Sequence, residues 1–320
     1  MCYEVFAEEE AALKRYLPKE IQAGFSAKTV QLETLPQPPA RLISIRTQSL
    51  IPSGWYGGLS GILTRSSGYD HLSPVWKGSQ GKIACGYLPS YCAHAVAEHA
   101  LLVLLALSRK LKKQSAQFTA FSRDGITGAE CLGRKLLVVG VGRIGKEMAA
   151  LARGIGMEVK GVDLVTKVPD LEYVSLEEGI RDSDAMVCAL PLTRLTRGLL
   201  DYSRLKTARA GLLFVNISRG EISPIRDLKR LLEEEILGGI GLDVYEEENI
   251  LGDSLRTKKG SLTESGKMIL SLQGDDRVIF TPHNAFNTRQ ALERKARQSC
   301  ESVVAFLKNG SFPDPIPEEE

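Results

Sequence analysis

Short apolar runs rich in β-branched residues alternate with longer, helix-like stretches between residues 136 and 281. Each run is largely apolar on both faces, which is typical of a strand buried between two layers. Regular alternation of such strands with helices predicts an α/β fold with a doubly wound parallel sheet of the Rossmann kind. The six expected strands span residues 136–141, 159–164, 185–190, 211–217, 239–244 and 278–281.

A second and weaker series of apolar runs occupies the first hundred residues. Connections that contain proline and glycine separate these runs, as expected between short strands. The pattern predicts a smaller α/β domain. Its strands are expected at residues 3–6, 41–45, 60–64 and 82–85.

Two long helices are also expected. Residues 93–113 are apolar in their first half and basic near their end, where cations favour the helix dipole, and they predict one helix that could bridge the domains. Residues 288–308 have helical periodicity and end at Asn309-Gly310, a typical C-cap. The proline-rich, acidic tail at 312–320 is expected to be frayed.

Composition narrows the class of protein. The 320 residues are 43% hydrophobic, which is enough for two packed cores, and 41 basic residues against 39 acidic ones argue against a nucleic-acid partner. Six scattered cysteines are typical of free thiols in a reducing compartment, and no metal site is expected. The acidic start differs from a signal peptide, and no apolar run could span a bilayer, so we expect a cytoplasmic protein with no membrane partner.

Three glycines lie between an expected strand and an expected helix. Gly140 would allow a tight turn, Gly142 would let a pyrophosphate approach the backbone, and Gly145 would let helix and strand pack closely. Arg143 and Ile144 open the helix, whose free N–H groups and partial positive charge favour a phosphate. Because glycine turns of this kind are common, the turn alone is weak evidence for a dinucleotide.

An acidic residue, Asp163, ends the next expected strand, 18 residues after Gly145. There it could accept hydrogen bonds from the adenosine ribose hydroxyls, and it would repel a 2′-phosphate. The strand, turn, helix and acid together favour NAD over NADP, although Lys160 and Lys167 nearby leave NADP open. The structural alternative is a packing turn followed by an incidental surface aspartate.

Three residues with useful chemistry follow expected strand ends: Arg219, Glu248 and His283. The carboxyl ends of parallel strands face one crevice, so these side chains should converge. Arginine binds a carboxylate through two parallel hydrogen bonds, histidine delivers a proton near neutrality, and glutamate can fix the imidazole. The set suits hydride transfer between NADH and C2 of a small 2-oxo acid. Each residue alone also has an ordinary structural explanation.

From about Thr64 to Gly310 the sequence resembles the D-isomer-specific 2-hydroxyacid dehydrogenase family. Its closest likeness is to the D-lactate dehydrogenase branch, through the string Asp-Val-Tyr-Glu-Glu-Glu, the long insertion at 249–276 and Tyr91. Small 2-oxo acids such as pyruvate are therefore the leading substrates. The resemblance rests on Arg65-Ser-Ser-Gly-Tyr-Asp-His-Leu, Tyr91-Cys-Ala-His-Ala-Val-Ala-Glu-His, the glycine turn, Leu190-Pro-Leu-Thr-Arg-Leu-Thr and the segments that carry Asp243, Arg219, Glu248 and His283.

The resemblance implies catalytic roles for the arginine, glutamate and histidine. Glu248 is selected by its spacing from Asp243, and Glu246 and Glu247 stay open as alternatives. It also implies that Pro191, Ser218 and Asp243 line the nicotinamide side of NAD, with Asp243 suited to accept a hydrogen bond from the carboxamide.

For the substrate, the resemblance implies that backbone N–H groups around Ser67 and Gly68 hold the carboxylate, as the close approach at glycine allows. Tyr91 and Phe286 are expected beside the pocket, together with Arg219. Phe286 stands where the branch often has tyrosine, which changes the acids that fit. Cys92 is expected to be inert packing, and structural roles are favoured for His71, His94 and His99.

The family fold implies two Rossmann-like domains that close over the crevice. The substrate domain would be split between residues 1–98 and 288–320, with the NAD domain inserted at 99–287. A homodimer is a further expectation of the resemblance. Glycerate, phosphoglycerate, formate and branched oxo acids stay open as substrates. Arg65 is the one obvious nearby cation that could bind a substrate phosphate. The alternative function is that of a corepressor-like binding protein that senses NADH.

Overall fold

The computed structural model describes residues 1–166, 168–258 and 260–317, and the chain divides into two compact units. Unit 1 comprises Met1–Cys92 and Asn287–Glu320, whereas unit 2 is the continuous segment Ala93–Phe286. Both units are α/β structures built on parallel sheets. Unit 1 is therefore assembled from the two ends of the chain.

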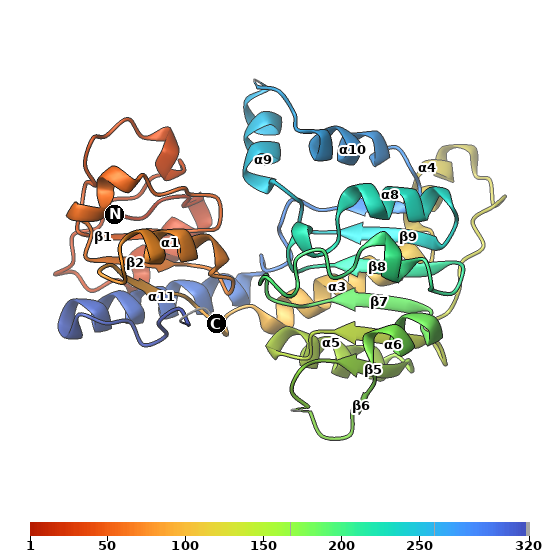
Figure 1. The fold of residues 1–320 in the computed structure, drawn as a ribbon. Coiled ribbons are helices and arrows are strands. Elements are labelled where there is room, and N and C mark those ends of the chain that lie inside the picture. The colour runs from red at the N-terminus through yellow and green to blue at the C-terminus, as the bar shows by residue number, and fades with distance from the viewer. Residues whose placement is uncertain (167, 259, 318–320) are drawn as a thin grey trace. The chain divides into compact units, whose positions relative to one another are not determined.

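Unit 2 contains a seven-stranded parallel sheet in the order β10-β9-β8-β7-β4-β5-β6 (Figure 1). All six expected strands are present, and several end before their predicted last residue because the chain turns out of the sheet there. The two-residue strand β6 was not expected, since it lies at the edge and is not buried on both faces. The strands are β4 (Lys135–Val139), β5 (Glu158–Val162), β6 (Glu172–Tyr173), β7 (Ala185–Cys188), β8 (Leu212–Asn216), β9 (Leu237–Leu242) and β10 (Val278–Phe280).

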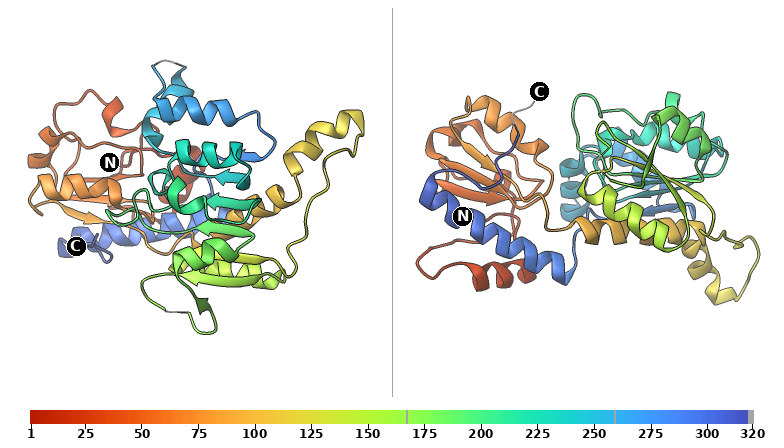
Figure 2. Two further views of the ribbon diagram at one scale, coloured as in Figure 1. Left: turned by 45° about the vertical axis from the view of Figure 1, so that its right-hand side comes forward. Right: turned by 90° about the horizontal axis from the view of Figure 1, so that it is seen from below.

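Helices cover both faces of this sheet (Figures 1 and 2). On one face the helix α3 approaches β9 so closely that a Cβ at Gly241 would lie 2.2 Å from the Val103 side chain. One face carries α3 (Ala93–Ser108) and α5 (Arg143–Gly154), and the other carries α6 (Leu176–Asp182), α7 (Tyr202–Leu205), α8 (Ile225–Glu233) and α10 (Glu264–Leu272). The predicted insertion contains α10 and most of α9 (Glu248–Thr257).

The single long helix expected at 93–113 is wrong. The helix α3 ends at Ser108, and Lys110 takes a left-handed φ of 53° before α4 (Leu111–Gln117) begins. Contacts with residue 129 stabilise this end of α3: the N–H of Ala129 donates to the Ser108 carbonyl, and the Ser108 hydroxyl donates to the Ala129 carbonyl. In each view α4 stands away from the sheet of its own unit (Figure 2).

Unit 1 has a three-stranded parallel sheet in the order β1-β2-β3. The strand expected at 3–6 is wrong, because Glu4 has a left-handed φ of 57° and its carboxylate accepts the N–H groups of Arg46 and Gln48. The last helix agrees with expectation, since Thr288 caps its start and Gly310 ends it with a φ of 73°. The elements are β1 (Leu42–Ile45), β2 (Gly61–Thr64), β3 (Ala84–Gly86), α1 (Ala7–Tyr16), α2 (Ser73–Gly78) and α11 (Arg289–Asn309).

Short 3-10 turns complete the chain, and the part of the tail that the structure describes packs against β3 and α11. The expectation of a frayed tail is wrong for this part: the Ile316 N–H donates to the Cys85 carbonyl, and Phe312 stacks on Phe306. A Cβ at Gly86 would lie 2.4 Å from the Phe312 ring, so β3 accepts the tail because that position lacks a side chain. The 3-10 turns are Val30–Leu32, Ser53–Gly58, Asp70–Leu72, Phe118–Ala120 and Gly220–Ile222.

An ion cluster lies inside unit 1, where Glu9, Arg65 and Lys295 have side-chain exposures of 0%. Glu9 Oε1 is 3.0 Å from Arg65 Nε and 2.6 Å from Lys295 Nζ. Arg65 also donates to the Ser44 hydroxyl and the Tyr3 carbonyl. Arg65 is therefore a core residue, and the suggestion that it could hold a substrate phosphate is wrong.

The charges of this cluster change one another's titration. Burial by itself would raise the pKa of Glu9, but Arg65, Lys295 and Arg46 together hold that pKa well below its ordinary value. Burial lowers the pKa of the Lys295 ammonium even though Glu9 favours the charged form. Two cations share one carboxylate in this core.

We expect Glu9→Gln to lower the free energy of unfolding by about 3–5 kcal/mol, because two buried cations lose their anion. The folded pKa of Glu9 lies below its unfolded value, so its stabilisation is present above the unfolded pKa and is lost as the pH falls toward the folded pKa. Urea unfolding at a series of pH values from neutral to acid measures both effects. The acid-dependent loss should be smaller in the variant.

Lys295→Met is the matched control, since it leaves Glu9 paired with Arg65. Its free energy of unfolding should stay close to that of the parent, because Glu9 and Arg65 still pair and no buried charge is left without an opposite charge. An unchanged urea midpoint in Glu9→Gln would contradict the assignment of this cluster as a stabilising core element.

Candidate active site

The glycine turn joins β4 to α5 within unit 2. Gly140 has a left-handed φ of 92°, and a Cβ there would lie 2.7 Å from the Ala189 carbonyl oxygen. A Cβ at Gly145 would lie 1.9 Å from the Gly140 carbonyl oxygen, so this helix packs against the turn only because glycine is present. Gly142 precedes the helix and faces open space. These features fit a pyrophosphate over the N-terminus of α5, beside Arg143 and Ile144.

Asp163, after β5, anchors the turn, which the sequence did not reveal. Its Oδ2 accepts the N–H of Val141 at 2.7 Å, and its Oδ1 accepts the N–H of Val165 at 3.1 Å. A carboxylate has about four acceptor sites, so lone pairs remain for ribose hydroxyls. One carboxylate can therefore fix the glycine turn and bind the adenosine ribose.

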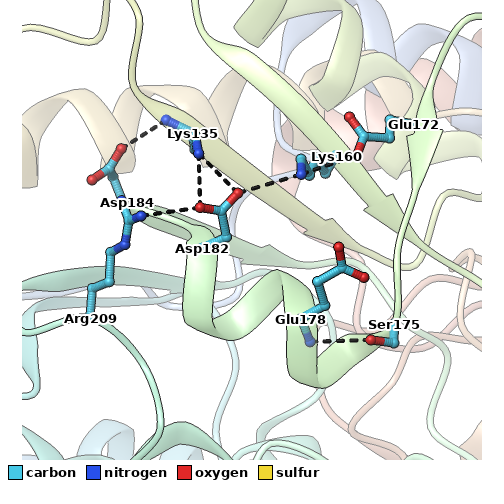
Figure 3. A network of polar contacts seen from close by, with 8 residues as sticks. All are labelled: Lys135, Lys160, Glu172, Ser175, Glu178, Asp182, Asp184 and Arg209. Carbon is cyan, nitrogen blue, oxygen red and sulfur yellow. Dashed lines mark hydrogen bonds and ion pairs between the residues drawn. The ribbon is translucent and has the colours of Figure 1, made fainter.

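The two lysines that kept NADP open are not equivalent. Lys160 points into a polar network in which its Nζ is 3.0 Å from Glu172 and 3.4 Å from Asp182 (Figure 3). Both carboxylates compete with a 2′-phosphate for this cation. Lys167 lies outside the residues that the structure describes.

Arg219 follows β8, and the segment after β9 lies directly against it. A Cβ at Gly220 would lie 2.0 Å from the backbone carbon of Tyr245, so only glycine fits between these segments. Arg219 Nη1 donates to the Ser218 carbonyl at 2.8 Å. The guanidinium is half-buried at the carboxyl edge of the sheet.

Glu248 and His283 form the central pair of the site. Glu248 Oε1 is 2.7 Å from His283 Nδ1, and the side chains are 20% and 22% exposed. Because an ionised carboxylate only accepts, Nδ1 carries the proton and Nε2 is left to face a reactant. Of the alternatives, Glu246 accepts the N–H of Ile225, and Glu247 is exposed.

Asp243 holds the loop that carries His283. Its carboxylate, 2% exposed, accepts the N–H of Asn284 at 2.8 Å and that of Ala285 at 2.9 Å. The Thr281 hydroxyl donates to the same carboxylate at 2.6 Å. The contact with the nicotinamide carboxamide that the family resemblance implies stays a prediction, and the contacts of Asp243 in the structure are with the loop that carries His283.

Pro191 and Ser218 follow β7 and β8, which are neighbours in the sheet. The Ser218 hydroxyl donates to the Cys188 carbonyl at 2.8 Å, and the Pro191 carbonyl accepts the Thr196 hydroxyl. Both residues therefore lie at the edge to which the glycine turn also belongs. Phe286, 8% exposed, is the last residue of unit 2.

Unit 1 contains the other expected substrate residues. The Ser66 hydroxyl donates to the Gly68 carbonyl at 2.7 Å, which orders the turn after β2. Cys92 Sγ is 3.8 Å from the Ser67 hydroxyl, and burial raises the pKa of the Cys92 thiol, as expected of inert packing. Arg294 donates to the carbonyl of Tyr91, a buried residue whose phenol pKa burial raises.

The remaining histidines make structural contacts. His94 is exposed and pairs with Glu147 and Glu98, and the Glu147 hydrogen bond raises the His94 pKa. His71 Nε2 is 2.9 Å from the Thr64 hydroxyl. His99 lies 3.1 Å from the Thr281 hydroxyl, a contact with the loop that carries His283 and one that the sequence did not suggest.

Among the described residues, no helix is long and apolar enough to cross a membrane. The same residues contain no group of three or more His, Cys, Asp or Glu side chains placed to hold a metal ion.

Comparisons with known proteins identify relatives along most of the chain. The NAD binding domain of the D-isomer specific 2-hydroxyacid dehydrogenases matches residues 101–285. The glyoxylate reductase of Pyrococcus furiosus is 30% identical over 267 residues, covering 79% of this chain and 74% of the relative. The D-lactate dehydrogenase of Escherichia coli is 28% identical over 235 residues, covering 72% and 70%.

A solved structure agrees in fold and sequence. The D-lactate dehydrogenase from Aquifex aeolicus, complexed with NAD and lactic acid, has a TM-score of 0.86 and 30% identity, covering 97% of this chain and 95% of that one. The fold and the glycine turn thus define an NAD-dependent oxidoreductase with two Rossmann-like domains. The chain belongs to the D-isomer-specific 2-hydroxyacid dehydrogenase family, and it is an NAD-dependent oxidoreductase.

We expect Gly142→Ala to weaken NADH binding by about tenfold or more, equivalent to about 1.4 kcal/mol. The new methyl group enters the open space where the pyrophosphate would lie, without a clash in the fold. Fluorescence titration with NADH measures the change. Gly154→Ala, at the other end of α5 and equally open, is the control, and equal NADH affinity in both variants would count against this cofactor position.

Proposed function

We propose that this enzyme reduces a small 2-oxo acid to the D-2-hydroxy acid, with unit 2 binding NAD and unit 1 contributing the substrate domain. The 2.7 Å contact between Glu248 and His283 carries the proposal, because it orients an imidazole at the sheet edge that also holds the glycine turn. The family match at 101–285 lies within unit 2, which supports this division of labour.

His283 is proposed as the acid and base. NADH, when bound, supplies the hydride that goes to C2 of the oxo acid. In its imidazolium form, with a proton on each ring nitrogen, His283 donates the Nε2 proton to the carbonyl oxygen as negative charge develops there, and the neutral ring takes that proton back from the hydroxyl in the reverse direction. Glu248 holds the ring through Nδ1 and stabilises the charged imidazolium by its own charge.

Arg219 is proposed to bind the substrate. Its planar guanidinium can form two parallel hydrogen bonds with the carboxylate and polarise the carbonyl. Within unit 1, backbone N–H groups near Ser67 and Gly68 are proposed to contribute to substrate binding. We propose Tyr91 and Phe286 as residues that limit the side chain of the acid.

Pyruvate is the proposed substrate, and glyoxylate is the second candidate. Relatives named D-lactate dehydrogenase and glyoxylate reductase have similar identity to this chain. The solved relative with 30% identity contains lactic acid, which favours pyruvate. The two acids differ by one methyl group, for which a pocket can discriminate by only about 10- to 200-fold.

A homodimer is also proposed, formed through the segment that includes α4. Phe118 and Phe121 are 73% and 78% exposed, and Leu111 and Leu132 in the same segment are 49% and 74% exposed. Large apolar side chains grouped in this way are typical of a surface that another chain covers. A second copy suits this surface because most soluble oligomers are homo-oligomers.

We propose the cytoplasm as the location. The six cysteines form no disulfide, as is usual for a protein in a reducing compartment.

The assay that tests the function is NADH oxidation with pyruvate, glyoxylate and bulkier 2-oxo acids. His283→Asn should lower kcat by about 10²- to 10⁴-fold, because the proton donor is lost, while NADH affinity stays the same. His94→Asn is the matched control, an exposed histidine whose loss should leave turnover unchanged. Full turnover by His283→Asn, or no turnover with any acid by the parent, would refute the proposal.

The dimer is tested by a double variant, Phe118→Ser with Phe121→Ser. Sedimentation velocity should show a shift from dimer to monomer, since the change removes the two most exposed aromatic side chains of the segment. Leu195→Ser, 79% exposed outside that segment, is the control and should stay dimeric. A parent protein that sediments as a monomer would contradict the proposed assembly.

A further inference from the structure

Thr281, between β10 and the catalytic histidine, has a polar contact at each of its polar atoms. Its N–H donates to the Leu242 carbonyl at 3.0 Å, and its carbonyl accepts the Tyr245 hydroxyl at 2.8 Å and the His283 N–H at 2.9 Å. Its hydroxyl contacts Asp243 at 2.6 Å and His99 at 3.1 Å. The start of the loop is therefore fixed by hydrogen bonds with β9, with the segment that follows β9 and with α3.

The direction of the hydrogen bonds follows from the groups involved. A threonine hydroxyl has one proton, and an ionised carboxylate only accepts, so the Thr281 proton points to Asp243. The same hydroxyl oxygen must then accept the proton on His99 Nε2. His99, 17% exposed on its side chain, is also 3.8 Å from the buried Asp243 carboxylate.

This chain of contacts leads to the backbone beside His283. Asp243 accepts the N–H groups of Asn284 and Ala285, so Thr281 on one side and these two residues on the other hold the loop. The loop needs such support, because His283 has a left-handed φ of 50°. A residue other than glycine keeps that conformation only where its surroundings impose it.

His99 also lies close in sequence to the point at which the chain enters unit 2. The chain enters unit 2 at Ala93 and leaves it at Phe286. His99 lies near the start of α3, just after the entry, and Ala285 lies just before the exit. The contacts therefore link the first and the last segment of unit 2 to the loop that carries His283.

We propose that His99 is a positioning residue for the hydride-transfer reaction: it holds Thr281 and Asp243, and through them the backbone that presents His283. The inference rests on the proposed role of His283 as proton donor. His99 acts without touching the substrate. For this role, residue 99 must donate a hydrogen bond to the Thr281 hydroxyl from the position of Nε2.

A pair of polar substitutions tests this requirement. His99→Gln places an amide nitrogen near the position of Nε2, whereas His99→Asn is shorter and cannot reach Thr281. His99→Asn should lower kcat on the order of tenfold to a hundredfold, as expected for a misplaced catalytic group. His99→Gln should restore kcat to within a few-fold of the parent, and both should keep the parent affinity for NADH.

Thr281→Val removes the intermediate hydroxyl with little change in volume, and it remains informative if His99→Asn does not fold. It should lower kcat as much as His99→Asn does. The double variant should be no worse than either single variant, because the two changes break one chain of contacts. His94→Asn, on the same helix but on the surface, should keep the parent kcat.

Parent-level turnover in His99→Asn and Thr281→Val would overturn the proposal. So would equal losses in His99→Gln and His99→Asn, or losses that multiply in the double variant. Failure of the proposed function gives a different result, since His283→Asn would then turn over normally. If His283→Asn is inactive while His99→Asn is fully active, only the positioning role is refuted.

Discussion

The parallel order of β8, β9 and β10 is the constraint on which the active site depends. Because neighbouring strands run the same way, the segments after them leave the sheet at one edge, and each carries one of the proposed catalytic residues. The missing side chain of Gly220 then lets two of these segments touch. Residues that are far apart in the sequence therefore lie together at one edge of the sheet, and no long loop is needed for this.

Local pattern predicted the larger sheet well because its central strands are buried on both faces and read as nearly continuous apolar runs. The local pattern gave a wrong prediction where residues are buried but do not pair with a neighbouring strand. Tyr3 and Val5 are buried as expected of a strand, yet the left-handed Glu4 between them prevents a regular ladder. The end of α3 and the ordered tail depend on contacts with distant residues, which periodicity does not report.

For the site, the sequence could predict the residues that follow strand ends, since their chemistry and position are both local. It could not predict their supports. His99 looked like one more residue of an apolar helix, because its partner Thr281 is 182 positions away. Asp163 was assigned to the cofactor by its place after a strand and Asp243 by the family resemblance; in the structure the two carboxylates accept backbone N–H groups of the glycine turn and of the loop that carries His283.

The split construction of unit 1 sets the order in which the protein can form during synthesis. Unit 2 is complete once Phe286 has emerged, but the first 92 residues still lack α11. Until then Glu9 has one cation instead of two, and the space beside Gly61 awaits Phe306. The domain whose synthesis begins first therefore completes its folding last, and its apolar surface stays exposed to chaperones and proteases for the longest time.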